Sequence, residues 1–391
     1  ALSNDFLRET GVGLRHFRGI PDNTLDQLAL TRKLLREGAS GPDVLDVDVS
    51  WLGALQGDLA DLRPYFTAEM TSMGTGLASS YVVGGKLVAI PYQNHVGALE
   101  YREDLLRKYG YDHPPKTWDE LERMAVRIQA GERAKGKKDF WGYVWPGAAA
   151  ESLTCDALEW QVSEGGGRII ESDSTISVNN PAAIRAWQRA KGWIGWISPP
   201  SVPQYSEVDA GNAFDSGRSA FARRWIGDPA RPSTNAGEGL RLHPWVSEPS
   251  HIEIGYTTMP GGSVAAAGTL GGMGLAISKH SNHPREDATL IRFLIRKQFE
   301  SWQEITLPKS TQVVIYDLSP MLARRNNSDK AAPPIVVSRP SAVAANSYEQ
   351  VTRAYFGTIH SVLTGERGAP EAAAELERSL IKITGFRTGP P

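Results

Sequence analysis

Cysteine is almost absent from this chain, since Cys155 is the only one among 391 residues. A single thiol can form no internal disulfide and no cysteine-based zinc site. Cys155 lies within the largely apolar segment 153–158. We therefore predict that it is a buried structural thiol.

The chain also lacks an excess of positive charge, a long apolar run and a cofactor motif. Its formal net charge is -2, and no run of lysine and arginine alternates with aromatics, which argues against nucleic acid as a partner. No segment approaches the roughly 18 to 20 apolar residues that a membrane-spanning helix needs. His280 and His283 lie in a polar segment, and no HExxH, P-loop, GxSxG or GxGxxG pattern occurs. We predict no metal and no cofactor.

A chain of this length suits two domains, and its hydrophobic patterns predict an α/β class. A strand at 12–17, a helix at 23–37 and a strand at 42–49 together predict a parallel crossover unit. A hairpin is expected to turn at Gly84 and Gly85. Thr117 and Glu120 predict a capping box that opens a helix. Further helices are predicted at 103–109, 151–163, 181–194, 283–306 and 371–384, and further strands at 96–101, 255–259 and 274–277.

Tryptophan is the most informative residue type, with 11 copies. Trp145 and Trp225 stand beside polar residues or turn signals, and an indole stacks on the apolar face of a sugar while polar groups bind its hydroxyls. This mixture favours carbohydrate recognition. The tryptophans on predicted helices are expected in the core instead: Trp160, Trp187, Trp193 and Trp302.

Two other functions stay open at this point. A glycoside hydrolase needs only two suitably spaced carboxylates, and four are eligible: Glu151, Asp156, Glu159 and Glu207. A pure interaction module would bind no small molecule. Glu159 is left out of the predicted binding residues, because a carboxylate beside Trp160 on a helix suits an ion pair with a core arginine.

Several motifs together resemble one family, the family 1 extracellular solute-binding proteins that deliver sugars to ABC importers. They extend from near residue 23 to residue 348, and each of them alone would be weak. The motifs are Gly-Pro-Asp-Val at 41–44, Asp-Val-Ser-Trp at 48–51, the segments 89–92 and 98–106, Pro-Lys-Thr-Trp-Asp-Glu-Leu at 115–121, 142–145, 151–155, Glu-Trp at 159–160, 220–225, 269–272 and 338–341. Some of them resemble a trehalose- and maltose-binding subgroup.

The resemblance implies a two-lobed periplasmic-binding-protein fold of α/β class, type II-like, with a ligand cleft between the lobes. Lobe 1 is expected from residues 1–101 and about 255–308, and lobe 2 from about 102–254 and 309–391. Hinge closure on an α-linked glucose disaccharide, trehalose before maltose, would deliver the sugar to membrane permease subunits. No catalysis is expected.

The same resemblance and the side-chain chemistry give the expected binding residues. Stacking is assigned to aromatic rings, hydrogen bonding to polar groups, and close approach of main-chain amides to glycines. The predicted set is Asp48, Asn94, His95, Trp145, Glu151, Glu207, Trp225, Gly271, Gly272 and Arg339. His95 stands where members of this family usually carry Asp or Asn. Met273 stands where they commonly carry Trp.

The resemblance further implies a monomer in the periplasm or another extracytoplasmic space. The chain begins at Ala1, with neither a methionine nor a secretory signal before it, which fits a processed chain. A lipid anchor is an open alternative.

Overall fold

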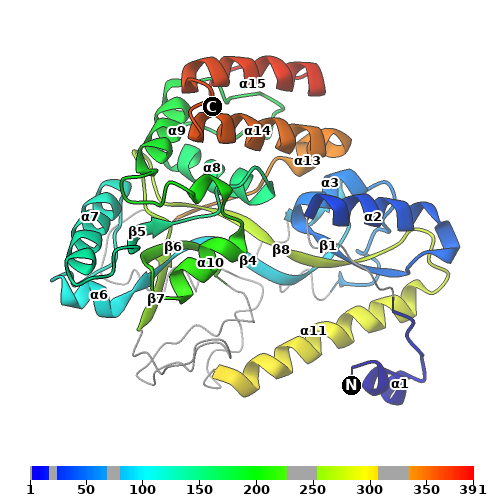
Figure 1. Cartoon of the computed structure of the whole chain (residues 1–391). Helices are drawn as coiled ribbons and strands as arrows, with labels where there is room; N and C mark the ends of the chain where they lie inside the picture. Colours follow the sequence, from blue (N-terminus) through cyan, green and yellow to red (C-terminus); the bar gives the residue numbers. More distant parts are fainter. Residues whose placement is uncertain (1, 17–23, 68–79, 227–252, 307–333) are drawn as a thin grey trace. The chain divides into compact units, whose positions relative to one another are not determined.

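The chain forms two compact units in the computed structural model, which describes residues 2–16, 24–67, 80–226, 253–306 and 334–391 (Figure 1). Unit 1 contains residues 2–16, 24–67, 80–94, 271–306 and 344–348. Unit 2 contains residues 95–226, 253–270, 334–343 and 349–391. Within the described residues the chain passes from one unit to the other at 94/95, 270/271, 343/344 and 348/349. The sequence predicted changes of lobe at 101/102 and at about 254/255 and 308/309.

The sheet of unit 1 is built on β1 (Val44–Asp48), which pairs antiparallel with the end of β8 (Ala267–Ile277). Val44 lies opposite Ile277, and Asp48 opposite Met273. Residues 12–16 form no regular structure, and Phe17 lies outside the described residues. The predicted parallel crossover unit is therefore wrong, because the strand that pairs with β1 comes from a distant part of the chain and runs antiparallel.

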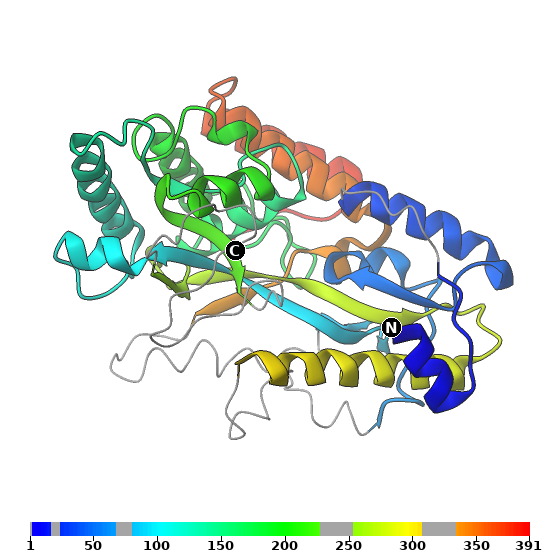
Figure 2. The same ribbon diagram turned by 60° about the horizontal axis from the view of Figure 1, so that its bottom comes forward.

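The other elements of unit 1 mostly follow their local sequence. Helix α2 (Thr24–Arg36) buries three leucines, as its spacing predicted. The hairpin of β2 (Val82–Val83) and β3 (Lys86–Leu87) is confirmed, with positive φ at both glycines of its turn. Helix α1 (Leu2–Thr10) packs on α11 (Pro284–Thr306) through Phe6 and Phe293, whose ring centroids are 5.1 Å apart (Figure 2). The short helix α3 spans Leu52–Leu55.

The other described strands of this seven-stranded sheet lie wholly or mostly in unit 2. Strand β4 (Ile90–Arg102) pairs antiparallel with β6 (Ser219–Ile226) and with β7 (Ile254–Thr258). Strand β6 pairs parallel with β5 (Trp141–Val144), and β8 pairs parallel with β9 (Ile335–Val337). Both β4 and β8 are continuous across the boundaries at 94/95 and 270/271, so they are covalent connections between the units.

Most of the described helices belong to unit 2, where α9 contacts both α8 and α15 (Figure 1). Helix α7 begins after Thr117, whose hydroxyl accepts a hydrogen bond from the amide of Glu120. The Glu120 carboxylate accepts from the amide of Lys116, one residue before the position that a capping box requires. The helices wholly within unit 2 include α6 (Glu103–Lys108), α7 (Trp118–Ala134), α8 (Glu151–Ser163), α9 (Pro181–Trp193), α10 (Glu207–Asp215) and α15 (Ala369–Thr384). Helix α14 (Tyr348–Leu363) lies in unit 2 from residue 349, and the short α13 (Ser341–Ala344) up to residue 343.

Aromatic side chains form much of the core of unit 2. Trp160 packs edge-on against Trp193, with ring centroids 5.7 Å apart. Trp160, Trp187 and Trp193 are at most 1% exposed, which confirms their predicted core positions. The side chain of Trp302 lies outside the described residues. Cys155 is also buried, as predicted, and burial raises the pKa of its thiol.

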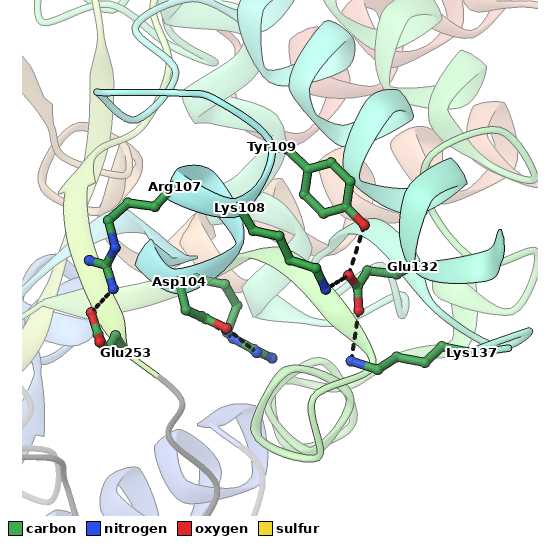
Figure 3. Close-up of polar contacts among 8 residues, drawn as sticks. Asp104, Arg107, Lys108, Tyr109, Glu132, Lys137 and Glu253 are labelled. Carbon is green, nitrogen blue, oxygen red and sulfur yellow. Dashed lines mark hydrogen bonds and ion pairs between the residues drawn. The ribbon is translucent and has the colours of Figure 1, made fainter. Parts of the chain in front are cut away.

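A buried carboxylate joins α6 to α7 (Figure 3). Glu132 is fully buried and accepts hydrogen bonds from Lys108 and from the hydroxyl of Tyr109, while Lys137 lies 2.8 Å from its second oxygen. Desolvation alone would raise its pKa, but these donors outweigh it and lower the pKa to about 2. Glu132 thus has a structural role.

Candidate functional site

The structure brings several of the predicted binding residues together within each unit. His95, Glu207 and Trp225 form one group in unit 2, and Glu151 and Arg339 form another. Asp48, Asn94, Gly271 and Gly272 belong to unit 1. Trp145 lies in the core of unit 2.

Trp225 is held at the end of β6 by contacts around its ring. Its indole N–H donates to Glu207 Oε1 over 3.0 Å, and Glu207 is the first residue of α10. The ring of His95 lies 6.5 Å away between centroids, tilted by 43°. The guanidinium carbon of Arg223 lies 3.8 Å from the Trp225 ring centroid. Trp225 itself is only partly buried, so its indole combines a fixed position with access to solvent.

Arg223, which the sequence did not single out, is the centre of a buried charge cluster. Its side chain is 1% exposed, and it donates to Glu159 Oε1 over 2.7 Å. Its Nε lies 3.0 Å from Asp156 Oδ1. The ion pair between Arg223 and Glu159 confirms the expectation that Glu159 pairs with a core arginine. Burial raises the pKa of Asp156 well above its usual value, against the opposing effect of Arg223.

Glu151 and Arg339 form a second buried ion pair in unit 2. Arg339 Nη1 donates to Glu151 Oε1 over 2.9 Å, and the two side chains are 4% and 8% exposed. The hydroxyl of Thr352 donates to the other carboxylate oxygen over 2.6 Å. Glu151 is the first residue of α8, where the helix dipole favours a negative charge. Glu151 and Arg339, two of the predicted binding residues, are therefore ion-pair partners of each other.

Asn94 and Asp48 of unit 1 lie near the buried side chain of Tyr81. Its hydroxyl donates to Asn94 Oδ1 over 3.3 Å, and burial followed by the charges of Asp48 and Asp46 raises its pKa. Asp48 Oδ1 accepts from the amide of Ser50 over 2.7 Å. Strand alternation puts Asp46 and Asp48 on one face of β1, a signal that could have identified Asp46.

Gly272 owes its identity to strand packing. Its φ is +114°, and a Cβ at this position would lie 1.9 Å from the carbonyl oxygen of Gln93 on β4. Gly272 is therefore required by the close approach of the β4 backbone. The sequence had predicted another reason, the approach of a main-chain amide to a ligand.

The prediction that Trp145 is a stacking platform is corrected by its burial. Its exposed fraction is 0%, and its ring packs edge-on against Trp160 with centroids 5.0 Å apart. Its indole N–H donates to the Ser198 hydroxyl over 3.1 Å. A ring enclosed in this way has no face for a ligand, so Trp145 is a core residue.

Among the residues that the structure describes, no cluster of three or more His, Cys, Asp or Glu could hold a metal ion. Within the same residues, no helix is both long and apolar enough to cross a membrane. Of the four carboxylates that a hydrolase could use, Asp156 and Glu159 bind Arg223, and Glu151 binds Arg339.

Solved structures of similar fold define the class of protein. T. maritima MalE3 with bound maltose is 28% identical, with a TM-score of 0.79 over 98% of this chain and 95% of that one. The GacH receptor of Streptomyces glaucescens, solved unliganded and with acarbose, is 19% identical with a TM-score of 0.74 over 99% and 94%. This second likeness shows the fold alone. The chain is thus a two-lobed receptor of the periplasmic-binding-protein class.

The chain belongs to the bacterial extracellular solute-binding proteins, whose family model matches residues 6–299. A Deinococcus radiodurans protein named "Probable ABC transporter-binding protein" is 37% identical over 377 residues, which cover 94% of this chain and 86% of that protein. Proteins of this family bind solutes outside the cytoplasm and work with the permease components of ABC transporters. They are not enzymes, which closes the hydrolase alternative.

Proposed function

We propose that this protein binds a neutral sugar, specifically an α-linked glucose disaccharide such as trehalose or maltose, for an ABC importer. The arrangement of Trp225 supports this most directly, because an accessible indole beside a carboxylate offers an apolar face and a hydroxyl acceptor. The likeness to MalE3 with bound maltose supports the same ligand class.

The proposed contacts follow from the chemistry of each group. Trp225 stacks on the sugar, while Glu207 and His95 bind hydroxyl groups beside it. Glu151 and Arg339 orient further hydroxyls through the oxygens and N–H groups at the edge of their ion pair. In unit 1, we propose that Asp48 and Asn94 bind sugar hydroxyls and that Gly271 and Gly272 leave room for the ligand because they carry no side chain.

A neutral ligand suits these groups better than an anionic one. Asp48, Glu151 and Glu207 are acidic, and the one arginine in the proposed set is already 2.9 Å from Glu151. A phosphate or carboxylate group would meet more negative than positive charge. Phosphorylated sugars are therefore disfavoured.

Delivery requires that a permease distinguish the loaded protein from the empty one. We propose that the sugar shifts the population toward a closed form by contacts that the open form lacks, and that the protein does this as a monomer. An extracytoplasmic location follows from the family, and a lipid anchor is a proposal that mass spectrometry of the native protein would test.

The first test is thermal unfolding with a panel of neutral mono- and disaccharides. A sugar that binds only the native state, at about 100 times its Kd, adds about 2.7 kcal/mol to the free energy of unfolding and raises the Tm. We expect this for trehalose or maltose, with the sugar recovered intact. An unchanged Tm with every sugar in the panel would contradict the proposed ligand class.

The second test compares two accessible tryptophans of unit 2. Trp225→Ala should weaken binding of the sugar identified above by at least about tenfold, because stacking area and a fixed ring are lost together. Trp196 is 48% exposed and lies outside the proposed set. Trp196→Ala is the matched control and should leave the Kd, measured by calorimetry, unchanged; equal effects of the two variants would remove Trp225 from the site.

A further inference from the structure

Arg223 makes contacts on two sides of its planar guanidinium. Its N–H groups donate to Glu159 over 2.7 and 3.2 Å, and its Nε lies 3.0 Å from Asp156 Oδ1. The guanidinium carbon also lies over the indole of Trp225, 3.8 Å from the ring centroid. An arginine can form both kinds of contact at once, because its donors point along the edges and its face can stack on an aromatic ring.

The order of residues along β6 explains this geometry. Arg223 and Trp225 are two residues apart on one strand, so both side chains point to the same face of the sheet. Arg223 is 2% exposed whereas Trp225 is partly exposed. Arg223 thus lies in the core of unit 2, and Trp225 lies next to it at the surface of the unit.

Glu159 fixes the buried end of this pair to three strands. Besides Arg223 on β6, its Oε1 accepts a hydrogen bond from the amide of Thr269 on β8 over 3.0 Å. On β4, a Cβ at Gly97 would lie 1.8 Å from the same oxygen, so the absent side chain makes room for the carboxylate. These contacts leave Glu159 little rotamer freedom, and they hold Arg223 in turn.

We propose that Arg223 is a positioning residue for Trp225: Glu159 and Asp156 hold its guanidinium so that it supports one face of the indole and orients the ring for a ligand. Glu207 holds the ring at its N–H, which gives a second fixed point. The inference rests on the proposed role of Trp225 in sugar binding. A ring ordered before the ligand arrives loses less conformational entropy on binding.

The charge balance of the cluster supports a permanent arrangement. Two carboxylates face one guanidinium in a fully buried place, and such a set keeps a net negative charge unless a proton is bound. The pKa of Asp156 is raised by burial and by the charges of Glu159 and Glu207. A protonated Asp156 leaves one carboxylate for one guanidinium, so no mobile counterion is needed.

The first arm of the test needs no ligand. Protein labelled with 5-fluorotryptophan has 11 tryptophans to observe by fluorine NMR, and Trp225→Phe assigns the resonance of Trp225. Arg223→Lys should shift or broaden that resonance. A lysine ammonium lacks the planar face that stacks on the ring and cannot at the same time replace the paired N–H donors that bind Glu159. Glu132→Gln, which alters another buried carboxylate of unit 2, should leave it in place. An unchanged Trp225 resonance in Arg223→Lys overturns the inference.

The second arm is a double-mutant cycle on the Kd for trehalose or maltose, whichever binds in the panel. Arg223→Lys should weaken binding about fivefold to tenfold in the wild-type background and have no effect in the Trp225→Ala background. Equal losses in both backgrounds overturn the inference, since Arg223 would then act independently of Trp225. If Arg223→Lys does not fold, Glu159→Gln replaces it, with a smaller effect in the same direction. If no sugar binds the wild type, the proposed function fails, and the fluorine resonance still decides the role of Arg223.

Discussion

At the scale of single residues, the chain uses buried charge where an apolar core would be simpler. Arg223 and Glu159 are both almost fully buried, and their mutual contact offsets the cost of removing two charges from water. Asp156 has no comparable partner of its own, since Arg223 is shared. The protonation state of Asp156 should therefore be visible in the stability of the whole protein.

The raised pKa of Asp156 predicts a dependence of stability on pH. The folded protein holds a proton that the unfolded chain releases above the ordinary pKa of 3.8, so the stabilisation is complete below that pH and is lost as the pH rises toward the raised value. Within this window the free energy of unfolding should fall by about 1.4 kcal/mol per pH unit relative to Asp156→Asn.

Urea unfolding of both proteins across the pH range would measure this difference. Asp112→Asn is the control, because the Asp112 side chain is 96% exposed. Parallel stability curves for wild type and Asp156→Asn would mean that Asp156 is ionised in the folded protein.

At the scale of elements, helices α7, α8 and α9 begin where the sequence predicted, because caps and apolar spacing are local signals. Strand β6 was missed, since its burial does not alternate and two arginines interrupt its apolar run. The partner of β1 could not be predicted, because Val44 and Ile277 are far apart in the sequence. Trp145 was assigned to a loop beside proline and glycine, but packing against Trp160 decides its place.

In the candidate site, too, the sequence predicted residue chemistry but not the contacts that depend on tertiary structure. The residue types of Trp225 and Glu207 suggested their chemistry, but their contact across 18 positions depends on how β6 and α10 pack. Arg223 had no sequence signal of its own. Its role depends on Glu159 and Trp225, which only the tertiary structure brings together with it.

The contact between α6 and α7 predicts sensitivity to acid. The pKa of Glu132 is lowered to about 2, so its stabilisation is present above the ordinary value of 4.5 and is lost as the pH falls through that interval. Glu132→Gln should reduce the free energy of unfolding by about 2 kcal/mol at neutral pH, and the difference from wild type should shrink below pH 4.5.

Chemical denaturation at several acidic pH values would test this. Glu371→Gln changes an exposed carboxyl of α15 and should behave as the wild type does. A difference between wild type and Glu132→Gln that stays constant down to pH 2 would show that Glu132 is not held ionised by its lysines.

At the scale of the whole molecule, the proposed binding residues are divided between the two units. Asp48→Asn in unit 1 and Trp225→Ala in unit 2 should each weaken sugar binding by at least about fivefold, because each removes a proposed contact to the sugar. Calorimetric titration measures both. Asp58→Asn, which alters a 42% exposed carboxylate of unit 1, is the control. If only Trp225→Ala weakens binding, the sugar contacts unit 2 without Asp48.

The solitary buried thiol has a practical consequence. Cys155 is 1% exposed, and burial holds its pKa above the ordinary value, so few thiolates are available for alkylation. A cysteine introduced at an exposed position such as Val208, which is 67% exposed and next to Glu207, would be the one reactive thiol of the described chain. A maleimide dye attached there would report on its surroundings without replacement of the native Cys155, which makes the chain a ready scaffold for an optical sugar sensor.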